Sequence, residues 1–185
     1  TYGIYNAAIA MACSFVILFN IPLAKILYAK DFFTAWNYSS VLLISIMFNA
    51  LTAFLGSIFS AVKDSKVIAF TTVVSAVCNI VLNILLIPKF GALGAAIATA
   101  ASYMVMWVLR LGYARKYIKM SVSIVKDCLV YGLLILQVVF EHTENHGYIG
   151  QIVIAFIIMF IYRKYIKTIV GVLFRKVKAK TGGAK

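Results

Sequence analysis

The feature that most constrains this chain is a pair of long apolar stretches that meet at a short turn, NIVLNILLIPKFGALGAAIAT, residues 79–99. Pro88 and Gly91 bracket the turn, and both residue types interrupt a regular helix. The apolar runs on either side, 67–87 and 92–109, approach the roughly 20 residues that a helix needs to cross the hydrocarbon core of a bilayer. This pair predicts a helical hairpin inside a membrane.

The composition of the whole chain agrees with a membrane environment. Hydrophobic residues make up 64% and charged residues 12% of the 185 residues, with a mean hydropathy of +1.00. Soluble domains have about 45–50% and about 25%, respectively. We therefore expect an all-α integral membrane protein, because the apolar runs lack the period-two alternation of barrel strands. Six runs predict six transmembrane helices, at about 4–27, 38–62, 67–87, 92–109, 123–140 and 148–162.

The basic residues predict how these helices are oriented. If the first span runs outward, 15 of the 18 Lys and Arg residues fall on one side, and only Lys25, Lys30 and Lys89 on the other. The positive-inside rule then places the C-terminus in the cytoplasm, with a six-helix unit, 1–170, followed by a basic tail, 171–185. The acidic segment 141–147 becomes an outer loop. The net charge of +13 lies on loops and tail, where it suits anionic membrane lipids, so we expect no nucleic-acid partner.

Polar residues mark one face of the predicted hairpin. Ser75, Asn79 and Asn83 recur every four residues, so they form a stripe along an otherwise apolar helix. Small residues between Gly91 and Ser102 recur at the same interval on the next helix, which permits close approach of two backbones in a bilayer. The stripe is therefore expected to face protein or a polar cavity rather than lipid.

The order Asn, Leu-Asn, Ile-Pro-Lys-Phe-Gly and Gly-Ala-Ala-Ile-Ala-Thr, together with the segment 22–65 upstream, resembles the polysaccharide transporter branch of the multidrug/oligosaccharidyl-lipid/polysaccharide flippase superfamily. The resemblance covers about residues 4–110. It implies an O-antigen or capsule repeat-unit flippase in the inner membrane of the cell, which moves an undecaprenyl-pyrophosphate-type lipid-linked oligosaccharide by alternating access. It also implies that the six helices form the second lobe of a two-lobe, roughly 12-helix transporter, with the N-terminal lobe of the same chain as partner.

Several polar groups are candidates for the substrate path of such a carrier. Amides can bond sugar hydroxyls, and a cation near the path would stabilise a pyrophosphate. The candidates are Asn79, Asn83, Asn49, Asn20, Lys25 and Arg110. A second reading stays open for each kind: the amides clamp neighbouring helices, Lys25 reaches the outer headgroups, and Arg110 anchors the inner end of its span. Pro22 is a candidate hinge, with a static kink as the alternative.

Catalytic and metal-binding constellations are not recognisable in the sequence. The five carboxylates fall at loops or predicted span ends, the three cysteines lie on separate spans, and His142 and His146 share one short loop. We therefore expect no enzyme activity, no metal and no cofactor. The alternatives are an ion-coupled drug or metabolite antiporter of the same superfamily, which is expected to hold a carboxylate within a span, a membrane enzyme of envelope glycan assembly, and a membrane scaffold.

Overall fold

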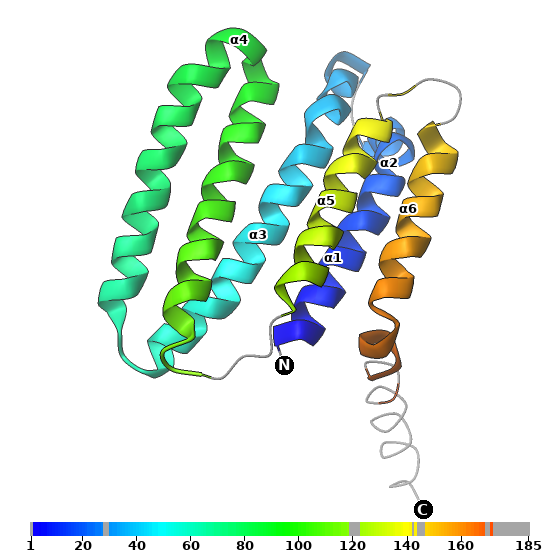
Figure 1. Ribbon diagram of the computed structural model, residues 1–185. Helices are drawn as coiled ribbons and strands as arrows, with labels where there is room; N and C mark the ends of the chain where they lie inside the picture. The colour runs from blue at the N-terminus through cyan, green and yellow to red at the C-terminus, as the bar shows by residue number, and fades with distance from the viewer. Residues whose placement is uncertain are drawn as a thin grey trace, which may run out of the picture.

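The computed structural model describes residues 2–27, 30–118, 123–141, 143, 147–168 and 171, and every structural statement below concerns these residues. Their regular elements are helices: α1 Tyr2–Leu18, α2 Asn20–Leu27, the 3-10 helix η1 Lys30–Ala35, α3 Trp36–Ala61, α4 Ser65–Ala114, α5 Ile124–Glu141 and α6 Gly147–Ile161. The longer helices α1, α3, α4, α5 and α6 run side by side, with the α4 hairpin on one flank and α6 on the other (Figure 1). The all-α class predicted from the apolar runs is confirmed.

The first predicted span is broken rather than straight. The axes of α1 and α2 differ by 65°, with the break between Leu18 and Asn20. Pro22 lies four residues after Leu18, so it has no N–H for the Leu18 carbonyl and its ring crowds that group. The kink predicted from Pro22 is therefore present, one helical turn before the proline.

Helix α4 contains 50 residues but turns back on itself at one glycine. Gly91 has φ 55° and ψ −131°, a conformation that residues with a Cβ rarely adopt. We call residues 65–90 the first arm and residues 92–114 the second arm; Figure 1 shows them as an antiparallel pair. The arms are so close near the tip that a Cβ on Gly94 would lie 2.6 Å from the carbonyl carbon of Leu86. The predicted hairpin is confirmed.

The core lies where α1, α3, α5 and α6 meet. Leu51, Leu55 and Phe59 of α3 are fully buried there. Phe48 of α3 and Trp107 of the second arm have ring centroids 5.7 Å apart, and both rings also contact Tyr131 of α5. The backbone of α4, by contrast, approaches α3 alone among the described helices. The hairpin therefore forms one flank of the bundle and packs on it through α3.

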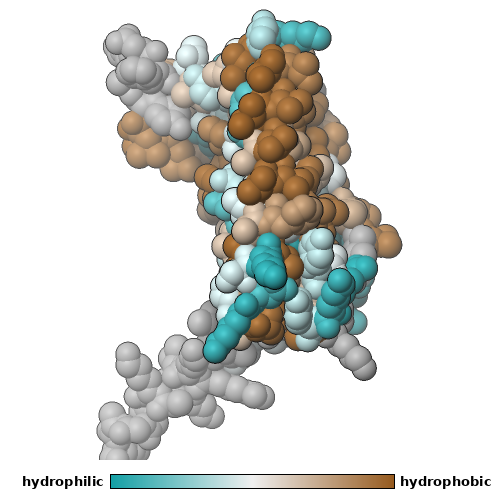
Figure 2. Space-filling view, turned by 90° about the vertical axis from the view of Figure 1, so that its left-hand side faces the viewer, coloured by the Kyte–Doolittle hydropathy of each residue, from teal (hydrophilic) through white to brown (hydrophobic). Residues whose placement is uncertain are grey.

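Two described helices are long and apolar enough to cross a membrane, within 33–61 and 65–114, and the bent pair of α1 and α2 would make a third. Helix α5 has charged residues in its first turn and at its last position, and α6 has only 15 residues, so six spans remain a prediction. Figure 2 shows a largely apolar outer face on the α4 flank, with hydrophilic residues gathered toward its lower end. Exposed apolar side chains of the first arm include Val73, Val77 and Ile84.

Two sequence-based expectations fall outside the described residues. They concern His142 and His146 of the predicted outer loop, and the basic tail beyond residue 171.

Candidate functional site

The predicted polar stripe lies in a seam between the two arms of α4. Ser75 Oγ donates to the Ser102 carbonyl at 2.8 Å, and Asn79 Nδ2 donates to Ser102 Oγ at 3.2 Å. Asn83 Nδ2 donates to Asn79 Oδ1 at 2.9 Å, which continues the chain toward the tip. Beside these bonds the surface is hollowed into a notch of about 280 Å³ that Ser75, Asn79, Thr99 and Ser102 help to line. We call Ser75, Asn79, Asn83, Thr99 and Ser102 the polar seam.

Arg110 lies at the lower end of the polar seam. Its side chain is only 7% exposed. Nε donates to Thr71 Oγ1 at 3.1 Å, Nη2 to Thr72 Oγ1 at 3.1 Å, and Nη1 to the Thr52 carbonyl at 2.8 Å. The guanidinium thus ties the second arm to the first arm and to α3. Its hydrogen-bond partners are all neutral, so the positive charge is buried without a described counter-ion.

This position corrects the reading of Arg110 as an anchor at the inner surface. A membrane anchor would extend toward headgroups, whereas Arg110 points into the protein, where Gly56 leaves room for it: a Cβ at Gly56 would lie 3.1 Å from Nη1. Thr72 lines the notch and also accepts from Arg110, so the notch and the cation share a wall. The other predicted cation, Lys25, is exposed on α2.

The remaining predicted residues do not join the polar seam. Asn49 is exposed on α3, and Pro22 is exposed on α2. Asn20 is buried, but its Nδ2 donates to Glu141 Oε1 at 2.7 Å and to Ser40 Oγ at 3.0 Å. The structure therefore brings together Asn79, Asn83 and Arg110, and separates Asn20, Asn49 and Lys25 from them.

Two of the five carboxylates lie at the ends of α5, as predicted, but they are buried in the bundle rather than open to a loop. Glu141 is 6% exposed and accepts from Asn20 and Ser40, so it belongs to the packed end of α5 rather than to an outer loop. Asp127 is also 6% exposed and accepts from Tyr162 at 3.1 Å. Both carboxylates are buried because donors from α2, from α3 and from the residue that follows α6 reach them from other parts of the chain.

These two carboxylates end a line of buried polar groups on α5. About one turn before Glu141, Gln137 accepts from Ser14 Oγ at 2.8 Å and donates to the Ser14 carbonyl at 2.9 Å. The sequence did contain a signal for this face: Asp127 and Glu141 are 14 residues apart, close to four helical turns. Buried Tyr131, on the same face, donates to Asn6 Oδ1 at 2.8 Å.

Comparison with known proteins settles the family. Residues 5–172 match the protein family described as "Lipid II flippase MurJ". The chain belongs to this flippase family. A curated relative, "Probable low-salt glycan biosynthesis flippase Agl15" of Haloferax volcanii, is 30% identical over 127 residues, or 68% of this chain and 27% of the relative. "Uncharacterized membrane protein MJ1068" of Methanocaldococcus jannaschii is 29% identical over 101 residues, 55% of this chain and 20% of that protein.

The match confirms the resemblance at the level of a flippase family. The polysaccharide transporter branch of the superfamily stays a prediction. Membership of a flippase family also favours a transporter over an enzyme. The aligned part of the chain spans about a quarter of the curated relatives' length. No solved structure matches the chain.

Proposed function

We propose that this chain takes part in translocating a lipid-linked oligosaccharide, an undecaprenyl-pyrophosphate-type repeat unit, across the cell membrane for surface polysaccharide biosynthesis such as that of O-antigen or capsule. The observation that carries the proposal is the polar seam that ends at the buried Arg110. It combines hydroxyl and amide groups, which suit sugar hydroxyls, with a cation, which suits a pyrophosphate. The polar groups of the seam and the Arg110 cation lie on the α4 hairpin of this flippase family member.

The chemistry of the two ends of the seam differs in a way that fits such a substrate. Asn79 and Asn83 bond one another and Ser102, so these groups can exchange partners with sugar hydroxyls at little net cost. Arg110 uses three of the five N–H groups of its guanidinium in the described bonds, and two remain for an anion. In this proposal the glycan lies toward the tip of the hairpin and the pyrophosphate toward Arg110.

We further propose that residues 1–170 form one six-helix lobe of a two-lobe, roughly 12-helix transporter that works by alternating access. The partner would be the N-terminal lobe of the same chain, and the C-terminus would be cytoplasmic. The lower end in Figure 1 is where α3 passes into α4 and where α4 ends. Lys63 and Lys66 lie at the first of these points and Arg115 and Lys116 follow the second, which supports this orientation. Reporter fusions at the C-terminus of the full-length protein test the topology: activity of a periplasmic reporter there would contradict it.

Deletion of the gene for the full-length protein in the native host tests the function. The expected result is loss of surface glycan with accumulation of complete lipid-linked repeat units on the inner leaflet. In complementation, the Asn79→Leu and Arg110→Gln variants should insert into the membrane but export less glycan than the wild type. Asn49→Leu, which changes an exposed amide outside the seam, serves as the matched control. Accumulation of incomplete units would instead indicate an enzyme of glycan assembly.

One observation favours a second candidate, an ion-coupled antiporter of the same superfamily. Such a carrier needs a titratable group inside the bundle, and Asp127 and Glu141 are buried carboxylates on α5. Altered drug sensitivity in the deletion strain, with surface glycan intact, would support the antiporter and contradict the flippase.

A further inference from the structure

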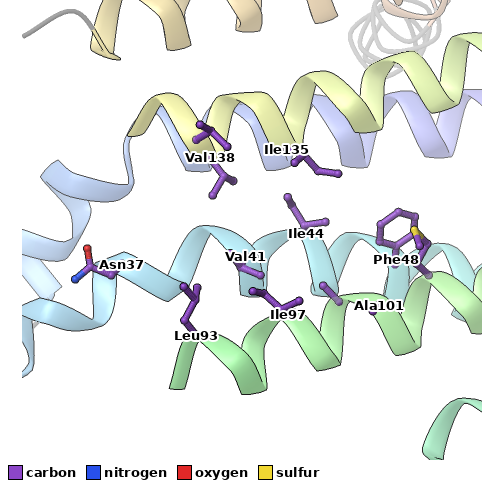
Figure 3. Close-up of a pocket in the computed structure, with 12 residues that line it drawn as sticks. Asn37, Val41, Ile44, Phe48, Leu93, Ile97, Ala101, Ile135 and Val138 are labelled. Carbon is purple, nitrogen blue, oxygen red and sulfur yellow. The ribbon is translucent and has the colours of Figure 1, made fainter. Parts of the chain in front are cut away.

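A second cavity lies on the other side of the second arm of α4. It is a groove of about 540 Å³, with the second arm and α5 as walls and α3 as floor (Figure 3). Ile44 and Phe48 form part of the floor, while Ile97 and Ala101 face Val138 across the opening. The groove exists because α4 packs its backbone against α3 and not against α5. Its volume lies within the range of about 300–1,000 Å³ that is typical of ligand pockets.

The lining of this apolar groove suits a hydrocarbon. Asn37, at the upper end, is the one polar side chain among the lining residues. The wall formed by the second arm is uneven, because the large side chains of Ile97 and Met104 flank the small Ala101. A branched chain can place its methyl groups over such small residues. Both helices that carry floor and wall, α3 and α4, are long and apolar enough to cross a membrane, so the groove opens within the hydrocarbon region.

Charge distinguishes the two ends of the groove for a lipid with a phosphate headgroup. At the upper end, near Asn37, Ser40 of α3 holds the buried Glu141 carboxylate, which disfavours an anion there. At the lower end, Arg115 closes α4 and is exposed. Arg115 is 18 residues after Ile97, or five full turns, so it lies on the same helical face as the groove wall. An anionic headgroup is therefore complementary to the lower end.

The distance between Arg115 and the groove determines how long the hydrocarbon chain of a bound lipid must be. Leu93, the uppermost wall residue of the second arm, lies 22 residues from Arg115, or roughly 33 Å along a helix. The surface between them stays apolar, since Val108 on the same face is 53% exposed. A phospholipid acyl chain fills one leaflet, about half of the roughly 30 Å hydrocarbon core. A chain that starts at Arg115 must exceed one leaflet to fill the groove.

We infer that the apolar groove binds the polyprenyl chain of the lipid-linked substrate, with its phosphate end at the lower end of the second arm, where Arg110 and Arg115 lie, and its distal isoprene units over Ala101 and Ile97. This inference rests on the proposed function, because it takes the substrate of the flippase to be polyprenyl-linked. It assigns head and tail to different faces of one helix: the second arm presents the polar seam on one side and the groove on the other.

Photolabelling of the full-length protein in native membrane vesicles tests the inference. The probe is undecaprenyl phosphate with a diazirine in the distal part of its chain, and the comparison probe is phosphatidylglycerol with a diazirine in one acyl chain. We expect the polyprenyl probe to label peptides around Ala101 and Val138, in competition with unlabelled undecaprenyl phosphate. Ala101→Trp, which fills the groove, should weaken this labelling about ten-fold. Val77→Trp, on the exposed outer face of the first arm, is the matched control.

Three results would overturn the inference: no labelling of the groove, equal labelling by the phospholipid probe, or labelling that Ala101→Trp leaves unchanged. If Ala101→Trp fails to accumulate in the membrane, Arg115→Gln replaces it and should shift or weaken the labelling in the same direction. Labelling measures binding and not translocation. The two failures can therefore be distinguished. If gene deletion leaves glycan export intact but the groove is labelled, the proposed function fails and this inference does not.

Discussion

The close approach of the two arms of α4 predicts a large effect for a single methyl group at Gly94. A Cβ there would lie 2.6 Å from the Leu86 carbonyl carbon, whereas ordinary contacts begin at 3.4 Å, so the arms must part by about 0.8 Å. The bond from Asn79 to Ser102, already 3.2 Å long, is the nearest interhelical bond below the tip and would be weakened or lost. Backbone atoms cannot rotate away from the new methyl as a side chain could.

The expected cost follows from these displacements. Overpacking costs about 1–3 kcal/mol, and an interhelical hydrogen bond in a membrane about 0.6–2 kcal/mol. Alanine gains about 1 kcal/mol over glycine in helix propensity, so Gly94→Ala should lower the free energy of unfolding by roughly 1–4 kcal/mol. Gly112→Ala in the same arm is the control, because nothing lies within 4 Å of its Cβ. It should be neutral or stabilising by up to about 1 kcal/mol.

Denaturant unfolding of the full-length protein in detergent micelles measures both variants on the same scale. The reasoning is refuted if Gly94→Ala unfolds at the same denaturant concentration as Gly112→Ala, because the two arms would then not be in backbone contact at this point. A fall in both variants by the same amount would refute it as well, since it would indicate a general intolerance of α4 to alanine.

Three further predictions concern polar groups of the bundle. Arg110→Lys keeps the charge but cannot reach Thr71, Thr72 and the Thr52 carbonyl together, so thermal unfolding should show a loss of roughly 1–3 kcal/mol; unchanged stability would mean that the charge alone matters. Gln137→Leu leaves both polar groups of Ser14 without their partner, and should cost roughly 1–3 kcal/mol in the same assay, largely recovered in a double variant with Ser14→Ala. The pKa of Asp64, outside the spans, lies below its ordinary value of 3.8 because the Tyr117 hydroxyl donates to it at 2.5 Å. Its stabilisation is therefore complete above pH 3.8 and lost as the pH falls through the lower folded pKa, and Asp64→Asn should remove this part of the acid dependence of unfolding.

The sequence predicted the hairpin and the polar stripe because their determinants are local. Proline, glycine and the four-residue interval of Ser75, Asn79 and Asn83 lie within one short stretch, and their partners follow about 25 residues later. Six spans and the assignment of one lobe depend on helices α5 and α6, whose charge and length leave these points as predictions.

The buried carboxylates and the position of Arg110 could not be predicted in the same way. Glu141 is satisfied by Asn20, 121 residues earlier, and Arg110 by the Thr52 carbonyl, 58 residues earlier. A charged residue near the end of an apolar run looks like a membrane boundary when its partners are unknown. Only the packing of α5 against α1 and α3, and of α4 against α3, shows that these groups point inward.

The line of polar groups on α5 has a consequence for how the protein is made. Gln137 and Glu141 face donors and acceptors that belong mainly to α1 and α2, more than 100 residues earlier in the chain. A polar group without a partner in the hydrocarbon region of a membrane costs several kcal/mol. Helix α5 therefore depends on the first two helices remaining beside the insertion machinery until it is synthesised. A defect in Ser14 or Asn20 would appear first as misplacement of a segment translated much later.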